Sequence, residues 1–301
     1  MFSREMFLTV RLWQSAAMET ANTNPHIGVV GVGHMGAPIA RRLIERYSVS
    51  VSDVDAGRES DVPGAIWVNS ARGLAATSDI FISVLPGPVE LRECLAEALP
   101  ALRGGALWLD LTSGDPVVTR ELAAQAAQRG VDTMSAPMGG SAVEAKAGEL
   151  IFYASGADEP FQRARPILET LASPDGVRRA GRRAEDGQIV KLLANALWFA
   201  NAVAASEAML VGQGLGLGVN DLHGLLRESA GGSVFLDDHL PLLLAGDSME
   251  SFGIDRVVEE LDTVSTMSRA AGATTPMLDA SKRLHAQRST DSAPCSGSYS
   301  P

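Results

Sequence analysis

Cysteine, positive charge and long apolar runs are all in short supply in this sequence. Its two cysteines, Cys94 and Cys295, have no spacing typical of a disulfide framework or a metal site, so we expect a reduced, cytoplasmic protein without a bound metal. Asp and Glu outnumber Lys and Arg by 36 to 25, which gives a formal net charge of −11. Nucleic acids and anionic membranes attract basic surfaces, and we therefore expect neither as a partner.

An uninterrupted apolar run of about 18 residues, the usual mark of a membrane-spanning helix, is also missing. The first 24 residues nevertheless loosely resemble a targeting peptide. Glu5 and Arg11 interrupt their apolar run and Met18 is a plausible start, so we interpret residues 1–24 as a disordered or mis-started extension. Residues 287–301 are rich in Ser, Pro and Gly and are predicted to form a disordered tail.

Strand and helix patterns alternate through residues 25–184. Short apolar runs rich in β-branched residues indicate buried strands at HIGVV, SVSVSDVD, DIFISVLP, GALWLDLTS, VDTMSAPM and ELIFYASG. Helical stretches lie between several of them, at residues 35–46, 116–129 and 160–171. This alternation predicts an α/β domain with a parallel, doubly wound sheet of the Rossmann type, covered by helices on both faces.

Residues 185–286 show helical periodicity alone, interrupted by glycine-rich joints at GQGLGLG and SAGGS. We expect this segment to be an all-α domain that follows the α/β domain. A long helix carrying Lys191 would join the two, and a cleft between domains is a favoured place for a ligand. The 301 residues suffice for two domains of ordinary size, roughly 100–200 residues each.

A glycine-rich turn follows the first predicted strand. It reads GVGHMG, with Gly31, Gly33 and Gly36 in the spacing of a dinucleotide-binding fingerprint, and His34 and Met35 between them. The glycines allow a tight turn and let a pyrophosphate approach a helix N-terminus, whose free N–H groups favour anions. A glycine-rich turn without a ligand is the alternative. Because a strand precedes the turn and a helix follows it, we predict a nucleotide site.

Asp53 ends the second predicted strand, twenty residues after Gly33. A carboxylate there can accept hydrogen bonds from the ribose hydroxyls and would repel a 2′-phosphate. The nearest arginine is Arg58, so NAD is favoured as the cofactor, with NADP as the alternative. Asp55 competes for the same role, and either aspartate could simply cap a turn.

Lys191 lies in an unusually apolar stretch, GQIVKLLAN. Burial disfavours an ammonium and lowers its pKa toward the range in which it can give and take a proton. Asn195 follows four residues later, so both side chains project from one face of a helix. The alternative is a lysine whose stem packs against apolar groups while its charged head reaches water.

Several segments in this order resemble the β-hydroxyacid dehydrogenase family, which includes 3-hydroxyisobutyrate, tartronate semialdehyde and 6-phosphogluconate dehydrogenases. They are GVGHMGAPIA, SVLPGP, DLTSGDP, SAPMGGSAVEAKAGEL and GQIVKLLAN, within residues 26–280. The resemblance implies a small-molecule oxidoreductase that uses NAD or NADP and is usually a homodimer or homotetramer. It makes Lys191 the general acid/base beside Asn195, and it places Leu85, Pro86 and Ser113 against the cofactor.

Two segments depart from the family pattern. The family's substrate loop reads roughly D-A-P-V-S-G-G, and its serine and glycine amides bind the substrate carboxylate. Here Gly139 replaces that serine and Gly140 and Ser141 follow, so one side-chain donor has moved or gone. A missing hydrogen bond to a charged group costs roughly 1.5–3 kcal/mol, enough to change substrate preference. In FGIDRVVEEL, Glu259 stands where the family has a lysine near the cofactor, a reversal that should discourage anionic substrates unless Glu259 points to solvent.

Three functions are compatible with these patterns. The first is a dehydrogenase that passes a hydride between the nicotinamide and a small 3-hydroxy acid or related alcohol. The second is reduction of a C=N bond, because DLTSGDP and IFYASG also look like segments of imine reductases and an acidic site would suit an iminium. Imine reductases usually carry Asp or Tyr at the position of Lys191, which argues against this reading. The third is a non-catalytic cofactor sensor, which the Lys191–Asn195 pair disfavours.

Overall fold

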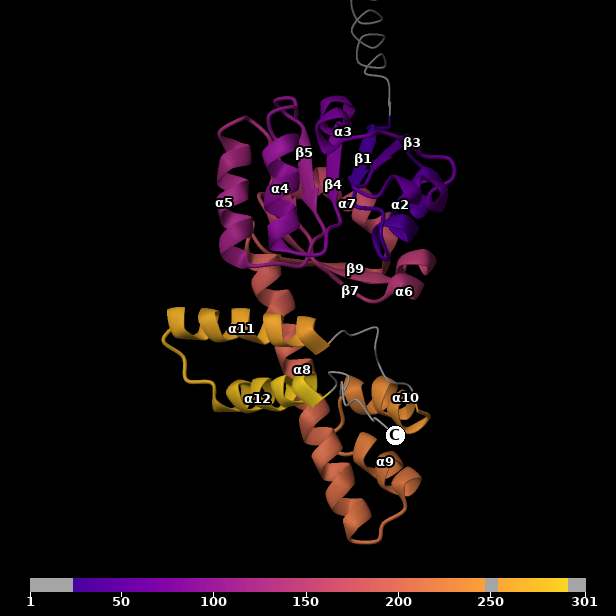
Figure 1. Ribbon diagram of the computed structural model, residues 1–301, viewed down its shortest axis with the longest axis vertical. Coiled ribbons are helices and arrows are strands. Elements are labelled where there is room, and N and C mark those ends of the chain that lie inside the picture. The colour runs from indigo at the N-terminus through magenta and orange to yellow at the C-terminus, as the bar shows by residue number, and fades with distance from the viewer. Residues whose placement is uncertain (1–23, 247–253, 292–301) are drawn as a thin grey trace, which may run out of the picture. The chain divides into compact units, whose positions relative to one another are not determined.

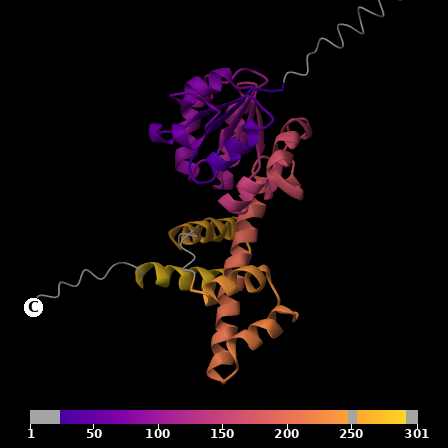
Figure 2. The ribbon, with the colours of Figure 1, turned by 90° about the vertical axis from the view of Figure 1, so that its right-hand side faces the viewer.

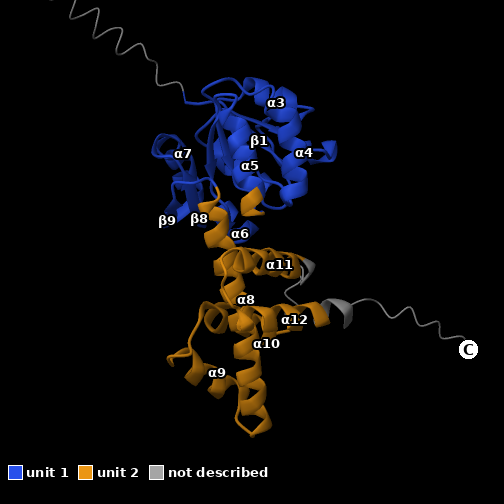
Figure 3. Cartoon of the chain, turned by 90° about the vertical axis from the view of Figure 1, so that its left-hand side faces the viewer, with its two compact units in different colours: residues 1–114, 118–184 blue, residues 115–117, 185–301 orange. Residues whose placement is uncertain are grey.

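The computed structural model describes residues 24–246 and 254–291 (Figure 1). The chain divides into two compact units, residues 1–114 with 118–184 and residues 115–117 with 185–301 (Figure 3). We call them the sheet unit and the helical unit. Nearly all of the extension predicted for residues 1–24 lies outside the described residues, as does most of the tail predicted for residues 287–301.

The sheet unit is built around a nine-stranded sheet. Its strands are β1 (Ile27–Val30), β2 (Val49–Ser52), β3 (Ile66–Trp67), β4 (Ile80–Ser83), β5 (Leu107–Asp110), β6 (Asp132–Ser135), β7 (Met138–Gly139), β8 (Leu150–Gly156) and β9 (Ala172–Gly181). Their order is β3-β2-β1-β4-β5-β6-β8-β7, with β9 beside β8, and the strands from β3 to β6 are parallel. The order reverses between β1 and β4, as in Rossmann folds, which confirms the predicted fold class.

Helices connect these strands and cover both faces of the sheet. They are α2 (Gly36–Ile44), the 3₁₀ helix η1 (Ala56–Asp61), α3 (Ala71–Thr77), α4 (Pro88–Ala98), α5 (Pro116–Ala127), α6 (Ala142–Ala147) and α7 (Asp158–Leu171). Successive residues of a strand point to opposite faces. In β4, Ile80 and Ile82 therefore belong to an apolar cluster shared with α2 and α7, whereas Phe81 belongs to one shared with α3, α4 and α5. The doubly wound layering follows from this alternation.

The last strands of the sheet differ from the predicted parallel arrangement. β8 runs antiparallel to β6, and β7 runs antiparallel to β8. β6 and β7 pair with β8 in one continuous register, and residues 140–149 alone join β7 to β8, fewer than the roughly dozen residues that a crossover between parallel strands requires. β9 was not predicted, because its sequence ASPDGVRRAG contains Pro, Asp and Gly, which are rare in strands. Irregular pairing with β8 overrides this weak local preference.

The helical unit contains α8 (Asp186–Gly214), α9 (Val219–Arg227), the π-helical segment η2 (Phe235–His239), α10 (Leu240–Leu244), α11 (Ile254–Ala270) and α12 (Pro276–Asp291). α8 contacts α9, η2, α11 and α12 (Figures 1 and 2). Leu192 and Phe199 of α8 pack with Leu261 of α11 in the unit's first apolar cluster. The structure confirms that this part of the chain is helical. α12 continues to Asp291, past residue 287 where we expected the tail to begin, because no Gly or Pro lies between Pro276 and Pro294.

α8 is also long and apolar enough, by length and composition only, to cross a membrane. Its sequence is not an uninterrupted apolar run, because it contains Lys191, Asn195 and Asn201. The core helix of a soluble protein can have the same length and composition. The packing of α11 and α12 against α8 accounts for part of its apolar surface.

Candidate active site

The glycine-rich turn lies between β1 and α2. Gly31 has a φ of +86°, and a Cβ atom on it would lie 2.2 Å from the carbonyl oxygen of Val84. A Cβ atom on Gly36 would lie 1.8 Å from the carbonyl oxygen of Gly31, so only glycine lets helix and turn approach this closely. A Cβ atom on Gly33 would meet nothing within 4 Å, which leaves its backbone open to a ligand. These features fit the cradle that a pyrophosphate requires.

The two residues between these glycines differ in their surroundings. His34 is exposed, whereas Met35 is partly buried and packs against the apolar cluster beneath α2. Met35 occupies the N-cap position of α2 without a side-chain capping bond. The first N–H groups of α2 therefore receive no oxygen from the Met35 side chain, as expected for a helix start that binds an anion.

Asp53 follows β2 and lies against the glycine-rich turn. Its Oδ2 accepts a hydrogen bond from the backbone N–H of Val32 at 2.7 Å, and its Oδ1 accepts one from the N–H of Asp55 at 3.0 Å. Asp55 is exposed and caps η1 by accepting from the N–H of Gly57 at 2.9 Å. Of the two aspartates that competed for the ribose, Asp53 is therefore the one bonded to the turn.

Arg58, the arginine nearest to Asp53 in sequence, is paired with carboxylates. Its guanidinium lies 3.8 Å from Asp55 and 3.6 Å from Asp61. Both ion pairs are solvent-exposed and contribute little to stability. They nevertheless surround the guanidinium with negative charge, which makes it a poorer partner for a 2′-phosphate than an unpaired arginine would be.

Leu85, Pro86 and Ser113 follow β4 and β5, on the same edge of the sheet as the glycine-rich turn. The register pairs Val30 with Ser83 and Ser83 with Asp110, so β1, β4 and β5 end side by side. The N–H of Leu85 donates to the Thr112 hydroxyl at 3.1 Å and ties the two loops together. In open α/β sheets, ligands bind beyond the carboxyl ends of the strands where the order reverses.

A buried carboxyl group beneath these loops was not anticipated from the sequence. Asp110 is fully buried, and its Oδ1 accepts bonds from the Ser83 hydroxyl at 2.8 Å and from the N–H of Thr112 at 3.1 Å. Trp108 donates its indole N–H to the same Ser83 hydroxyl at 2.9 Å. Burial raises the pKa of Asp110 to about 6, against the lowering effect of these hydrogen bonds. The sequence signal for this group was an acidic residue at the end of the apolar strand LWLD, where a carboxyl group is expected to be buried.

The predicted substrate loop is held by a helix cap. Gly139 belongs to β7, and Gly140 has a φ of +117°. The Ser141 hydroxyl donates to Glu144 Oε2 at 2.5 Å, and the Ser141 N–H donates to the same oxygen at 2.7 Å. The N–H of Val143 donates to the Ser141 hydroxyl, which completes a capping box at the start of α6. These bonds lower the pKa of Glu144.

Lys191 and Asn195 lie on the face of α8 that packs against α11. The Lys191 ammonium donates to Asn195 Oδ1 at 2.9 Å, and Asn195 Nδ2 donates to Glu260 Oε2 at 2.7 Å. Burial lowers the pKa of Lys191, as its apolar surroundings predicted. The negative charge of Glu260 opposes this lowering and the positive charge of Arg256 reinforces it.

Glu260 was not among the predicted site residues, whereas its neighbour Glu259 was. Glu259 is exposed, and only its backbone carbonyl has a described bond, from the Thr263 hydroxyl at 3.1 Å. The helical spacing of Val257, Leu261 and Val264 would have identified Glu260 as the carboxylate on the buried face. The structure places Glu260, rather than Glu259, beside the Lys191–Asn195 pair.

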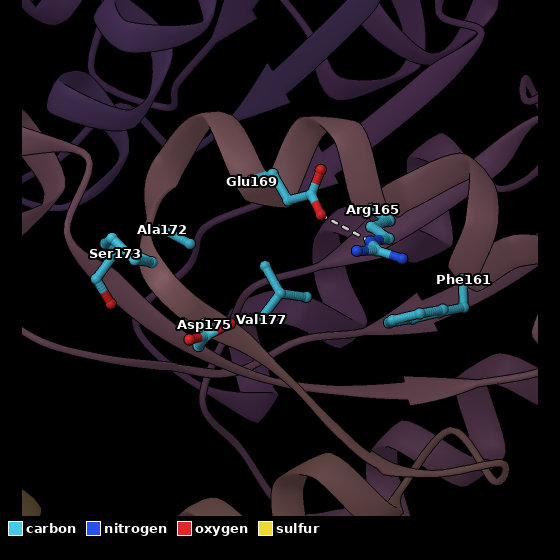
Figure 4. A pocket seen from close by; sticks show the side chains of 9 residues that line it. Phe161, Arg165, Glu169, Ala172, Ser173, Asp175 and Val177 are labelled. Carbon is cyan, nitrogen blue, oxygen red and sulfur yellow. Dashed lines mark hydrogen bonds and ion pairs between the residues drawn. The ribbon is translucent and has the colours of Figure 1, made fainter.

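A separate pocket of about 620 Å³ lies between α7 and β9 (Figure 4). It is lined by Phe161, by the ion pair of Arg165 and Glu169, and by Ser173, Asp175 and neighbouring residues of β9. None of the predicted site residues lines it. Within the described ranges, no group of three or more His, Cys, Asp or Glu residues is arranged to hold a metal ion.

Two families of known proteins match successive parts of this chain. Residues 26–181 match the NAD binding domain of 6-phosphogluconate dehydrogenase, which is more than half of the chain. The chain belongs to the β-hydroxyacid dehydrogenase family. Residues 186–293 match the family described as NAD-binding of NADP-dependent 3-hydroxyisobutyrate dehydrogenase. The predicted family and the predicted NAD or NADP cofactor are thus confirmed.

Individual relatives agree with this family. An NAD-dependent L-serine dehydrogenase of Pseudomonas aeruginosa is 28% identical over 83% of this chain and 88% of that enzyme. The mitochondrial 3-hydroxyisobutyrate dehydrogenase of Bos taurus is 32% identical over 72% of this chain and 65% of that enzyme. A structure of Mycobacterium tuberculosis 3-hydroxyisobutyrate dehydrogenase with L-serine aligns with a TM-score of 0.81, at 26% identity over 89% of this chain and 94% of that chain. They confirm the predicted class, an NAD(P)-dependent oxidoreductase of the hydroxyacid dehydrogenase type.

Imine reductases share the fold. An imine reductase from Pseudomonas sp. aligns with a TM-score of 0.61 at 19% identity, over 89% of this chain and 94% of that chain. Identity at this level shows a common fold and does not extend to the reaction.

Proposed function

We propose that this protein oxidises a small 3-hydroxy acid or related alcohol, or reduces the corresponding carbonyl compound, with Lys191 as the general acid/base. The observation that carries the proposal is the partly buried lysine bonded to Asn195. Burial lowers the pKa of Lys191, so the side chain can accept the hydroxyl proton during oxidation and return it during reduction. The cofactor, when bound, accepts or supplies the hydride.

The proposal assigns cofactor binding to the sheet unit. Gly31, Gly33 and Gly36 would cradle the pyrophosphate, with His34 and Met35 at the helix start beside it. Asp53 would accept hydrogen bonds from the ribose, and the acidic partners of Arg58 support NAD over NADP. Leu85, Pro86 and Ser113 would contact the remainder of the cofactor from the same sheet edge. Glu259, which is exposed, would lie near the cofactor, as its family position implies. Substitution of Glu259 should then alter cofactor affinity, and an unchanged affinity would remove it from the cofactor site.

The proposal assigns substrate binding to the Gly139–Ser141 loop and to Asn195. The backbone amide of Gly140 would supply a donor that does not depend on the missing serine, whereas Gly139 pairs with Ile151 of β8 within the sheet. Ser141 would bind a substrate carboxylate only by exchanging its present bonds to Glu144. The L-serine named for two of the relatives is a 3-hydroxy acid that carries an ammonium group. A substrate of that kind would suit an acidic protein whose Lys191 neighbours include Glu260.

We also propose a cytoplasmic homodimer or homotetramer. The scarcity of cysteine supports a reducing compartment. Exposed apolar side chains near the end of α8 and just after it support association between copies of the chain, because such patches commonly mark interfaces. They are Leu210, Val211, Leu215 and Leu217.

Imine reduction is the second candidate, favoured by the carboxylate of Glu260 near the lysine. An absorbance assay of the nicotinamide separates the two functions. The purified protein is tested with NAD(H) and NADP(H) against 3-hydroxy acids, including L-serine, with their semialdehydes, and against cyclic imines and carbonyl–amine pairs. Turnover of hydroxy acids that is lost in Lys191→Ala supports the proposal. Turnover of imines alone rejects it in favour of the second candidate, and cofactor binding without any turnover rejects both.

A further inference from the structure

Glu260 completes a hydrogen-bonded series that begins at Lys191 and crosses from α8 to α11. The ammonium donates to Asn195 Oδ1 at 2.9 Å, and Asn195 Nδ2 donates to Glu260 Oε2 at 2.7 Å. Glu260 is partly buried beside Val257 and Leu261, two residues of the helical unit's first apolar cluster. An ionised carboxylate in such a place needs a hydrogen-bond donor, and Asn195 provides it.

The carboxylate fixes which way the amide of Asn195 points. An ionised carboxylate only accepts hydrogen bonds, whereas an amide has one accepting end and one donating end. With Nδ2 directed to Glu260, the carbonyl oxygen Oδ1 is left for the Lys191 ammonium. An amide that turned over would present an N–H group to the ammonium and its oxygen to the carboxylate, so both contacts would become repulsive.

Glu260 also acts on Lys191 through its charge. The charged groups that affect the ammonium are Glu260, which raises the pKa of Lys191, and Arg256, which lowers it; both lie on α11. Several titratable groups on the other elements packed on α8 have described contacts of their own, and none of these groups is among those that shift the pKa of Lys191. On α12, Lys282 pairs with Asp262 and the His285 ring contacts Phe199; around η2, the His239 ring contacts Trp198 and His223 bonds the Leu236 carbonyl.

We infer that Glu260 is a positioning residue that orients Asn195 and keeps Lys191 protonated over a wider range of pH. The inference rests on the proposed role of Lys191, because the orientation matters to turnover only if Lys191 transfers a proton. Substitutions can separate its two parts. Glu260→Gln keeps an oxygen that can accept from Asn195 and removes the charge. Glu260→Asp keeps the charge and shortens the side chain, which withdraws the acceptor from Asn195.

The first test measures the protonation of Lys191 without any turnover. The rate of lysine acylation is followed from pH 6 to 11 and assigned by peptide mass spectrometry, which is straightforward because Lys146, Lys191 and Lys282 are the lysines of the chain. In Glu260→Gln the apparent pKa of Lys191 should fall by on the order of one pH unit. Glu207→Gln, which removes an exposed carboxylate from α8, is the matched control and should leave it unchanged.

The second test measures turnover. In the oxidation direction Lys191 must be deprotonated to accept a proton, so the acid limb of the kcat/KM profile should move to lower pH in Glu260→Gln by the same amount as the acylation profile. Glu260→Asp should keep the limb in place and lower kcat about tenfold, because the amide is no longer held. A merely structural role would lower stability without moving the limb.

The pKa of Lys191 in the variants decides the inference. Equal Lys191 pKa values in the wild type and Glu260→Gln overturn the inference, and so does an equal shift in Glu207→Gln. If Glu260→Gln lacks the helical circular dichroism of the wild type, Glu260→Ala is measured instead, with the same expected fall. A shifted acylation profile in a protein that turns over none of the substrates supports the charge effect of Glu260 and rejects the proposed function.

Discussion

Replacing Asp110 by Asn should change how stability depends on pH. Asp110 is fully buried beneath the loops that follow β4 and β5, and its Oδ2 has no hydrogen-bond partner among the described residues. Asn has nearly the shape of a protonated Asp and can still accept from Ser83 and Thr112 through its Oδ1. The substitution therefore removes the ionisation of the carboxyl group while it keeps the contacts of the neutral acid.

The magnitude follows from the raised pKa. Burial takes the pKa of Asp110 from 3.8 to about 6, so between these values the folded protein holds a proton that the unfolded chain has released. The unfolding free energy of the wild type should fall by about 1.4 kcal/mol per pH unit in this interval and level off above it, a total of about 3 kcal/mol. Asp110→Asn lacks this loss. Its stability relative to the wild type should therefore increase by about 3 kcal/mol from pH 4 to pH 7.

Urea unfolding at half-unit steps from pH 4 to pH 8 measures this difference, with the fluorescence of the buried Trp108 among the probes. Other titrating groups are common to both proteins and cancel in the comparison. Asp175→Asn, on an exposed residue of β9, removes the same formal charge and should show a flat difference. A difference for Asp110→Asn that stays constant across the range would refute the assignment of a neutral, buried Asp110 at acid pH.

Three other outcomes are expected. Burial, reinforced by the charges of Glu97 and Asp110, raises the pKa of Cys94 to about 12. Iodoacetamide should therefore alkylate Cys94 more than a hundredfold more slowly in the native protein than in urea. Comparable alkylation rates would contradict this expectation. Asp53→Ser should weaken NAD more than NADP in a binding titration, and an unchanged ratio would remove Asp53 from the cofactor site. Ser141→Ala should lower the unfolding free energy by about 1 kcal/mol through loss of the α6 cap, and wild-type stability would show that the cap contributes nothing.

The sequence was most informative where one local pattern had a single structural meaning. The apolar runs of β1, β4 and β5 and the glycine spacing around Gly33 predicted the Rossmann-type sheet and its turn. Strand direction at the far edge was not predictable in this way, because it depends on how the chain returns after β6. β9 escaped prediction because its pairing with β8, and not its own residues, makes it a strand.

The candidate site shows the same division. Lys191 and Asn195 are four residues apart on one helix, so their contact followed from helical geometry alone. Glu260 reaches them from another helix, and that contact depends on how α11 packs against α8. The choice of Glu259 over Glu260 rested on a family position and not on the helical face. The engagement of Ser141 by Glu144 was likewise open to prediction, since serine followed by glutamate three residues later is the pattern of a capping box.

The central claim is that Lys191 transfers the proton in an NAD(P)-dependent oxidation. The most direct test compares kcat/KM of the wild type and Lys191→Met on the best hydroxy acid of the screen, with cofactor affinity measured in parallel. Lys282→Met, which removes a lysine paired with Asp262, serves as the control. We expect a loss of at least about a hundredfold for Lys191→Met alone, with cofactor affinity unchanged. Near-wild-type turnover in Lys191→Met would contradict it.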